Sequence, residues 1–428
     1  MTRLEVTGEA RYRTIDEPRA VEMLLVHGWR FDVAAGQRGL AQRAAQAALD
    51  RCVDLGLPFG RAADGGRLFD PAEMWNFVEW SQLCLGERAW EDQCVSGARR
   101  DLWQWLADDA GWNQPPALDR LGPRRFAITI RRTFNLAGRA PGERVRLRLP
   151  LPVEDASLGD VQVAFLPSPD TAVQTSVAPA RLEALLAVPD DGQACIGVRI
   201  AFTARQGELG PAASLDPAEA ALYTRPGEGL IKVSERVRAL AAELAQGERN
   251  PLAVMRRFWR YMIDALACAA IHYDALDPAR PLDWVLEHGW YDCQIGSALL
   301  AALCRARGIP ARLVTGYMLH VTMPAFHTWM EAWIEGAGWL PFDLESWELS
   351  VGGRDADWRD HYFGQIDYRM VVERPPRLFA GLGTVRPPPA WHMLTRQNDH
   401  GATVCFEDLD TGALIYREDI EVENLGPV

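Results

Sequence analysis

The segment at residues 291–317, YDCQIGSALLAALCRARGIPARLVTGY, constrains the fold of this chain more than any other. Between residues 297 and 306, apolar side chains recur at three- and four-residue spacing, which is typical of a helix with one buried face. Gly308 supplies a C-terminal stop for this helix, and Pro310 follows two residues later. We therefore expect Cys293 at the N-terminus of a buried helix.

A cysteine at a helix N-terminus is well placed for nucleophilic chemistry. Free backbone N–H groups and the positive end of the helix dipole converge there, and both favour a thiolate over a thiol. The same N–H groups can stabilise an oxyanion during acyl transfer. The alternative is a buried structural cysteine, which is the role expected for Cys304 inside the same helix.

A strand and a hairpin follow in the run FHTWMEAWIEGAGWLPFD. Alternation places His327 and Trp329 on one face of the first strand. A turn centred near residue 337 would return the chain as a second strand and bring residue 343 back near residue 331. Asp343 then lies within a few residues of His327, close enough for its carboxylate to hold one imidazole tautomer.

Other residues compete for these roles. His320 is the second candidate base, but no acidic residue lies at a suitable place close to it in the sequence, so His327 ranks first. Glu345 and Asp292 are the competing carboxylates. Asp292, directly before the cysteine, is better placed to cap the helix.

Five short motifs of this region resemble, in order and spacing, those of the transglutaminase-like superfamily of papain-type cysteine enzymes. The cysteine and the histidine lie 34 positions apart, and the histidine and the aspartate lie 16 positions apart. The motifs are Asp292-Cys293, Gly308-Ile309-Pro310-Ala311-Arg312, Thr315-Gly316-Tyr317, His327-Thr328-Trp329 and Gly338-Trp339-Leu340-Pro341-Phe342-Asp343. The resemblance also covers the upstream helices expected from about residue 229.

The resemblance implies an α+β fold in which the nucleophile helix packs on an antiparallel sheet. It also implies a role for each of three residues. Cys293 would be the nucleophile, His327 the base and Asp343 the carboxylate that orients the base.

The chain departs from the family pattern just before the cysteine. Many members carry a glycine there, whereas this chain has Trp290-Tyr291 after Gly289. Trp290 or Tyr291 is therefore the candidate for a second oxyanion donor. Trp329, beside the expected base, is a further candidate for the substrate site.

The composition is that of a globular protein with more than one domain. Its 428 residues suggest roughly two to four domains. The net charge of −13 and the pI of about 5.2 argue against nucleic acid as the main partner. We expect neither a membrane-spanning helix nor a secretory signal. The eight dispersed cysteines favour reduced thiols in a cytoplasmic protein, and the eight scattered histidines form no zinc-ligand pattern.

Changes of pattern along the chain predict four regions. Residues 1–120 are expected to form a helical N-terminal domain, with helices at 16–28, 37–55, 70–86 and 87–107. Residues 121–210 alternate apolar and polar side chains between turn signals, which is typical of a small β-sandwich. Residues 211–385 would hold the catalytic core, entered through a linker at 213–228. Residues 386–428 would form a C-terminal β extension.

We predict a cysteine-dependent acyl enzyme that needs no cofactor and no metal. A peptide, amide or thioester substrate would acylate Cys293, and the acyl group would pass to water or to an amine. One alternative is a biosynthetic amide-forming acyltransferase that acts on carrier-bound substrates. An acidic carrier would then need a basic patch, for which Arg124-Arg125 and Arg131-Arg132 are the candidates. The other alternative is a non-catalytic binding scaffold, and the sequence leaves the oligomeric state open.

Overall fold

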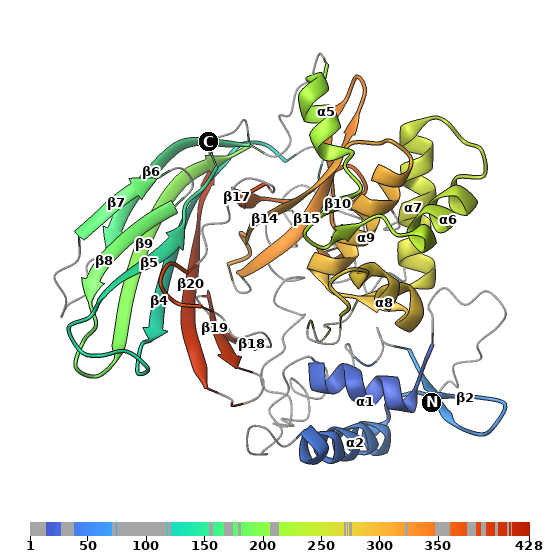
Figure 1. The fold of residues 1–428 in the computed structure, drawn as a ribbon, viewed down its shortest axis with the longest axis horizontal. Coiled ribbons are helices and arrows are strands. Elements are labelled where there is room, and N and C mark those ends of the chain that lie inside the picture. The colour runs from blue at the N-terminus through green and yellow to red at the C-terminus, as the bar shows by residue number, and fades with distance from the viewer. Residues whose placement is uncertain are drawn as a thin grey trace.

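The computed structural model has a β-sandwich on one side, a mixed helical and sheet core on the other, and a small N-terminal unit below the core in the view of Figure 1. It describes residues 14–26, 38–70, 74, 118, 121–153, 157–166, 174–178, 181–205, 214–268, 271, 273, 276–321, 324–346, 360–374, 382–386, 391–398, 401–408, 411 and 413–428.

The described N-terminal residues form two helices and a small antiparallel sheet. The helices are α1 (Glu17–Val26) and α2 (Arg38–Leu55). The strands, in sheet order, are β1 (Ile15–Asp16), β3 (Arg67–Phe69) and β2 (Gly60–Arg61). The two helices confirm the first two that the sequence predicts, whereas the sheet was not expected.

Arg67 ties this N-terminal unit together. Its guanidinium pairs with the carboxylate of Glu17 on α1 and lies 2.5 Å from that of Asp50 on α2. One cation between two carboxylates stabilises the packing of strand on helices, although the pairs are partly exposed and therefore partly screened. The helices expected at 70–86 and 87–107 lie, apart from residues 70 and 74, outside the described residues.

Two antiparallel sheets form the sandwich. The six-stranded sheet has the order β18 (Trp391–Asn398), β19 (Gly401–Asp408), β20 (Leu414–Pro427), β4 (Arg124–Asn135), β9 (Gln193–Ala204) and β6 (Leu158–Leu166). The three-stranded sheet has the order β5 (Arg144–Pro150), β8 (Arg181–Ala187) and β7 (Gln174–Ala178). Alternate residues of β5, namely Val145, Leu147 and Leu149, are fully buried. Such alternation is what the sequence predicts for a sandwich strand.

The C-terminal strands complete the sandwich. Strand β20 pairs with β4 in a register that runs from Tyr416 opposite Phe134 to Pro427 opposite Arg124. Residues 386–428 had been expected only as an extension after the core. The strand pattern was visible in the sequence, but the partner strand, almost 300 residues earlier, was not.

The helical part of the core consists of α5 (Pro217–Tyr223), α6 (Glu235–Ala245), α7 (Pro251–Ala265) and α8 (Pro281–His288). Two short strand pairs lie among these helices, β10 (Gly227–Glu228) with β11 (Ile231–Lys232) and β12 (Ala267–Cys268) with β13 (Trp290–Tyr291). The expectation of a linker at 213–228 was wrong. Asp216 caps α5, and Tyr223 packs edge-on against Trp339 of the core, so this segment is part of the folded unit.

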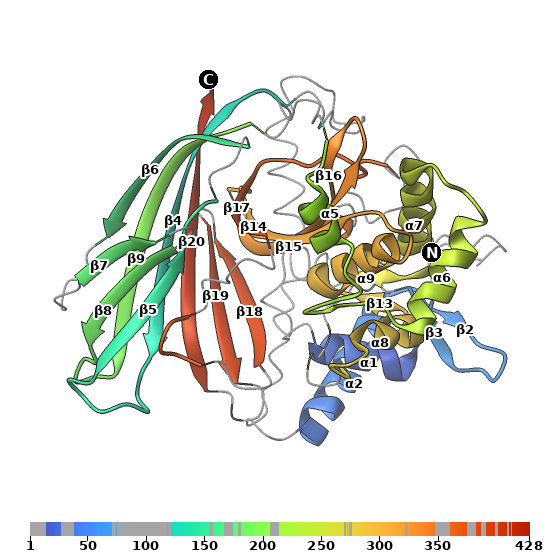
Figure 2. The same ribbon diagram turned by 45° about the horizontal axis from the view of Figure 1, so that its top comes forward.

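An antiparallel sheet of four strands carries the rest of the core. Its order is β16 (Gly338–Phe342), β15 (Ala325–Ile334), β14 (Ala311–Met318) and β17 (Arg369–Glu373). Helix α9 (Cys293–Ala306) packs on β14 and β15, as Figures 1 and 2 show. The expected apolar stripe of α9 is buried except for Ala306, which is partly buried, and the helix is in fact enclosed on every side, because all its residues from 295 to 305 are buried. The α+β class and the helix-on-sheet core are therefore as predicted.

A buried polar cluster joins the sandwich to the core. Arg132 of β4 pairs with Glu418 of β20, and both side chains are buried. The same carboxylate accepts a hydrogen bond at 3.1 Å from the hydroxyl of Tyr317 on β14. Leaving any one of these groups without its partner would cost several kcal/mol, so the cluster fixes how the sheets meet.

No helix among the described residues combines the length and the apolar character needed to cross a membrane.

Gly296 gives a test of how closely α9 is packed. A Cβ atom at this position would lie 2.3 Å from the ring of Tyr291, which is fully buried. We expect Gly296→Ala to lower the free energy of unfolding by about 1–3 kcal/mol, because the ring has no room to move.

Urea denaturation monitored by circular dichroism measures this change. The matched control is Gly138→Ala, where a Cβ would meet no atom within 4 Å and the free energy should stay within about 0.5 kcal/mol. Equal effects of the two substitutions would contradict the close packing of α9 on Tyr291.

Candidate active site

Cys293 is the first residue of α9, as the sequence predicts. Asp292 is the N-cap of this helix, and its carboxylate accepts hydrogen bonds from the backbone N–H groups of Gln294 and Ile295 at 3.0 and 2.9 Å. The capping role expected for Asp292 is thereby confirmed. The Cys293 side chain is partly exposed, and its sulfur accepts a hydrogen bond from the backbone N–H of Thr328 on β15.

His327 on β15 and Asp343 just after β16 form a buried pair. The Nε2 atom of His327 lies 2.8 Å from Oδ2 of Asp343, and the side chains are 2% and 1% exposed. The hairpin between the two strands is confirmed, but its turn is centred one residue earlier than expected. Glu331 therefore pairs with Pro341, and the shift leaves Asp343 beside His327.

Asp343 is held in place from its other side. Its carboxylate accepts hydrogen bonds from the backbone N–H and the hydroxyl of Ser346, at 2.9 and 2.8 Å. A guanidinium nitrogen of Arg369 on β17 lies 3.2 Å from Asp343 and 2.7 Å from the Ser346 hydroxyl. Because all these groups are buried, the carboxylate that orients His327 has little freedom to turn.

A second buried histidine–aspartate pair lies behind the first. The Nε2 atom of His320 is 2.9 Å from Asp367, which also faces Arg369 at 2.5 Å and accepts a hydrogen bond from Tyr362 at 3.0 Å. The sequence offered no acidic partner close to His320, because the partner lies 47 residues further along the chain. Asp367 and Arg369 are two positions apart in the sequence, which is the spacing of residues on one face of a strand. This spacing was the one signal in the sequence that the two side chains lie together.

Glu345 occupies the side of His327 that faces the cysteine. Its Oε2 atom lies 3.4 Å from Nδ1 of His327, and its carboxylate accepts a hydrogen bond from the Cys293 thiol. The sequence analysis treated Glu345 as a competitor of Asp343. In the structure the two carboxylates flank His327 instead, Asp343 at Nε2 and Glu345 at Nδ1.

The electrostatic surroundings hold Cys293 as a thiol. Burial raises the pKa of Cys293 well above its ordinary value, and the carboxylates of Glu345 and Asp292 raise it further. The hydrogen bond from Thr328 acts in the opposite direction but does not outweigh them. The thiolate expected from the helix dipole is therefore not favoured in this arrangement, because burial and then two nearby negative charges oppose it.

Asp292 shares these acidic surroundings. Burial raises its pKa to about 6, although the N–H group of Ile295 and the hydroxyl of Tyr273 both donate hydrogen bonds to the carboxylate. The Tyr273 hydroxyl lies 2.9 Å from Asp292, and burial, Asp292 and Cys293 raise its own pKa. Tyr273 thus lines the surroundings of the thiol, which no motif in the sequence indicated.

The three tryptophan and tyrosine candidates are buried in this structure. Trp290 and Tyr291 are fully buried, and the Trp290 ring meets Trp284 edge-on at 5.5 Å. Trp329 is 2% exposed, and its ring lies 6.1 Å from that of His327. The contacts with substrate or an oxyanion that were expected of these residues stay predictions.

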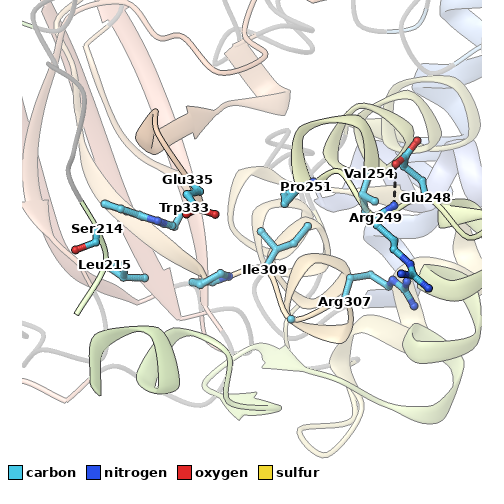
Figure 3. A pocket seen from close by; sticks show the side chains of 12 residues that line it. Ser214, Leu215, Glu248, Arg249, Pro251, Val254, Arg307, Ile309, Trp333 and Glu335 are labelled. Carbon is cyan, nitrogen blue, oxygen red and sulfur yellow. Dashed lines mark hydrogen bonds between the residues drawn. The ribbon is translucent and has the colours of Figure 1, made fainter. Parts of the chain in front are cut away.

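A cavity near α9 lies at the C-terminal end of the helix, whereas the Cys293 thiol lies at the N-terminal end. It has a volume of about 500 Å³ and is lined by Arg307, Gly308, Ile309 and residues of α7 and β15, as Figure 3 shows. Because α9 spans residues 293–306, Cys293 and this cavity are separated by roughly 20 Å of helix. We assign the cavity no part in the chemistry of Cys293.

Residues 238–344 match the family model described as the transglutaminase-like superfamily. These residues form a transglutaminase-like superfamily domain. Cys293, His327 and Asp343 all lie inside the match, and Glu345 follows it by one residue. No curated protein matches the chain.

Several solved structures resemble the chain at low identity. A candidate cysteine protease from Cytophaga hutchinsonii matches with 14% identity and a TM-score of 0.42, over 71% of this chain and 99% of its own. The periplasmic domain of TgpA from Pseudomonas aeruginosa matches with 20% identity and a TM-score of 0.30, over 55% and 93%. Red sea bream transglutaminase matches with 10% identity and a TM-score of 0.27, over 66% and 75%.

The first prediction for this site concerns Glu345. Replacing Glu345 by Gln removes a negative charge beside Cys293, so the pKa of the thiol should fall. We expect alkylation of Cys293 by iodoacetamide at pH 7.5 to become about tenfold faster, because a lower pKa leaves more of the thiol as thiolate. Peptide mass spectrometry after timed labelling measures the rate.

The control is Glu335→Gln, which replaces an exposed carboxylate at the end of β15 and should leave the rate unchanged. A rate no higher in Glu345→Gln than in the control would contradict the role assigned to Glu345.

The second prediction concerns the charge pair of His327 and Asp343. Burial alone would lower the pKa of His327, but the Asp343 carboxylate raises it above its ordinary value. Burial alone would raise the pKa of Asp343, but His327 and Arg369 lower it. The His327 contribution to stability is therefore present below about pH 6.5 and is lost as pH rises through its folded-state pKa. The Asp343 contribution is present above about pH 3.9 and is lost as pH falls through its folded-state pKa.

We expect the cost of Asp343→Asn to reach its maximum, about 3 kcal/mol, between about pH 4 and 6.5, where both contributions are complete. Denaturant unfolding of the variant and the wild type across this range measures the difference. A difference that does not change with pH would mean that shape rather than charge holds the pair together.

Proposed function

We propose that the protein is a cysteine-dependent acyl enzyme in which Cys293 is the nucleophile, His327 the base and Asp343 its orienting carboxylate. The observation that carries this proposal is the orientation of His327. With Nε2 bound to Asp343 at 2.8 Å, the ring carries its proton on Nε2 and leaves Nδ1 free of it, on the side of Glu345. A ring nitrogen of His327 lies within 4.8 Å of the Cys293 sulfur. The transglutaminase-like domain supports cysteine acyl chemistry as the general class.

The reaction follows from these positions. Nδ1 of His327 takes the thiol proton as the sulfur attacks the carbonyl carbon of an amide, ester or thioester. The bond to the leaving group then breaks, His327 returns the proton to that group, and the acyl chain stays on Cys293 as a thioester. Water or an amine attacks this thioester, gives its proton to His327 and releases the Cys293 sulfur.

The charge that develops on the carbonyl oxygen needs donors. The backbone N–H of Cys293, at the first position of α9, has no partner within the helix and is one donor in this proposal. Trp290 is the second, because its Nε1 is a buried donor without an acceptor among the described residues. Tyr291, which packs against Gly296, is less suited to this role.

Glu345 must give way during the reaction. In the resting site it accepts the hydrogen bond of the thiol and faces Nδ1 of His327, the atom that has to take the proton. Its side chain is 29% exposed, whereas His327 and Asp343 are buried, so it is the group that an incoming substrate can displace.

Removal of the nucleophile is the direct test of this function. We expect Cys293→Ala to lose acyl transfer from amide, ester and thioester substrates by more than about 10⁴-fold, with the fold unchanged by circular dichroism. Cys195→Ala, which removes a partly exposed thiol of β9, is the control and should keep full activity. Turnover by Cys293→Ala would exclude this mechanism.

A carrier-bound acyl group is the second candidate substrate, and a cluster of arginines favours it. Arg131 and Arg132, expected to meet an acidic carrier, instead face Glu421 and Glu418 of β20. A different cavity of about 520 Å³ is lined by four arginines and no acidic residue, namely by Arg144, Arg146, Arg148, Leu185, Gly383, Thr384 and Arg386.

The backbone builds this arginine cavity. Arg144, Arg146 and Arg148 alternate along β5, so they share the outer face of its sheet, and Glu183 of β8 pairs with Arg148 at 2.9 Å. Thr384 accepts a hydrogen bond from the Arg146 N–H at 2.8 Å. This contact, together with the close approach of Gly383 to the Arg146 carbonyl, carries Arg386 to the same face.

Charge reversal at this cavity tests the carrier proposal. We expect the double substitution Arg144→Glu and Arg386→Glu to raise KM for an acyl group on an acidic carrier about tenfold or more, with kcat unchanged and KM for the free acyl thioester unchanged. Arg238→Glu, at an exposed arginine of α6, is the control. Equal KM changes for bound and free acyl groups would remove the cavity from substrate recognition.

A further inference from the structure

Folding brings three metal-binding side chains together at Cys293. The Sγ atom of Cys293, a ring nitrogen of His327 and a carboxylate oxygen of Glu345 all lie within 4.8 Å of one another. Among the described residues this is the one such group of three histidine, cysteine or acidic side chains. The scattered histidines and cysteines of the sequence predicted no metal-ligand cluster, because the three ligands come from separate elements.

We propose that Cys293, His327 and Glu345 bind a divalent transition-metal ion of the Zn²⁺ class. A thiolate, an imidazole and a carboxylate form a borderline-soft ligand set that suits Zn²⁺ or Co²⁺ and does not suit Ca²⁺ or Mg²⁺. Three protein ligands leave a fourth position for water.

The separations fit a tetrahedral site. Bonds of about 2.0–2.3 Å place neighbouring ligand atoms of such a site roughly 3.3–3.6 Å apart. Nδ1 of His327 and Oε2 of Glu345 are already 3.4 Å apart. The two remaining separations are at most 4.8 Å, so they need to close by up to about 1.2–1.5 Å. The side chains of Glu345 and Cys293 are both partly exposed and can make these movements.

The surroundings of His327 match those of a metal ligand. A ligating imidazole usually donates its second ring N–H to a carboxylate, which fixes the tautomer that offers the other nitrogen to the metal. Here Nε2 donates to Asp343, and Asp343 is itself held by Ser346 and Arg369. Nδ1, on the side of Glu345, is the nitrogen left for the metal.

Binding exchanges one proton for the metal. The S–H bond of Cys293 breaks, the sulfur forms a bond to the metal, and the proton passes to the solvent. The imidazole is already neutral at Nδ1 in the tautomer described above. A bound ion would cover the sulfur and the nitrogen that acyl chemistry needs, so the metal would reversibly block Cys293.

Cobalt provides a direct readout that does not depend on acyl chemistry. We expect the full-length, metal-free protein to bind one Co²⁺ ion and to show a thiolate-to-cobalt charge-transfer band, which Zn²⁺ then displaces. Cys293→Ser should abolish the band, whereas the control Cys195→Ser should keep it.

Substitution of Glu345 tests whether the metal has three protein ligands or only the cysteine and the histidine. We expect Glu345→Gln to weaken Co²⁺ binding at least tenfold, and Asp343→Asn to weaken it about 10–100-fold as the loss of an outer hydrogen bond does at other sites. Glu335→Gln is the matched control and should bind as the wild type does. Circular dichroism of each variant excludes unfolding as the cause.

A second measurement checks the same site by protection. Zn²⁺ should slow the alkylation of Cys293 in the wild type, and the ratio of rates with and without Zn²⁺ should shrink in Glu345→Gln. A charge-transfer band that survives Cys293→Ser, or unchanged cobalt affinity in Glu345→Gln, would overturn the proposal. If the protein binds cobalt at this site but has no acyl activity, the metal-site inference stands and the proposed function is contradicted.

Discussion

The buried network of charges behind β15 determines where the imidazole of His327 points. Asp343 holds Nε2 of the ring, Arg369 and Ser346 hold Asp343, and Asp367 holds Arg369. Each of these groups is buried, so each is costly to leave without a partner, and the network favours a single arrangement. Because β14 joins both β15 and β17, the four-stranded sheet is the frame that brings the members of this network together.

Two carboxylates act on His327 in opposite senses. Asp343 holds Nε2, which leaves Nδ1 as the nitrogen that would take a proton in the proposed reaction, whereas Glu345 lies at Nδ1 and, together with burial, raises the pKa of the Cys293 thiol. A site arranged in this way is protected at rest, because a thiol is a much weaker nucleophile and metal ligand than a thiolate. In the proposed mechanism, it would gain reactivity when a substrate displaces the Glu345 side chain.

Local patterns in the sequence were sufficient to predict the parts of the core that depend on periodicity. The apolar face of α9, its cap at Asp292 and the hairpin that carries His327 and Asp343 all follow from spacing within about fifty residues. Long-range partners could not be predicted in this way. The pairing of β20 with β4, and the approach of Asp367 to His320, depend on how distant segments meet. The position of Glu345 was missed for another reason: a short helical turn after β16 points it back at His327, and no periodicity marks that turn.

The central claim is that Cys293, activated by His327, forms a covalent acyl intermediate. The most direct measurement is rapid mixing of the protein with excess activated thioester, acid quench, and mass spectrometry of the cysteine peptides. The account predicts that one acyl group is added, at Cys293, and that His327→Ala slows its formation by about 10²–10⁴-fold. Acylation spread equally over Cys195, Cys293 and Cys405, or unaffected by His327→Ala, would contradict it.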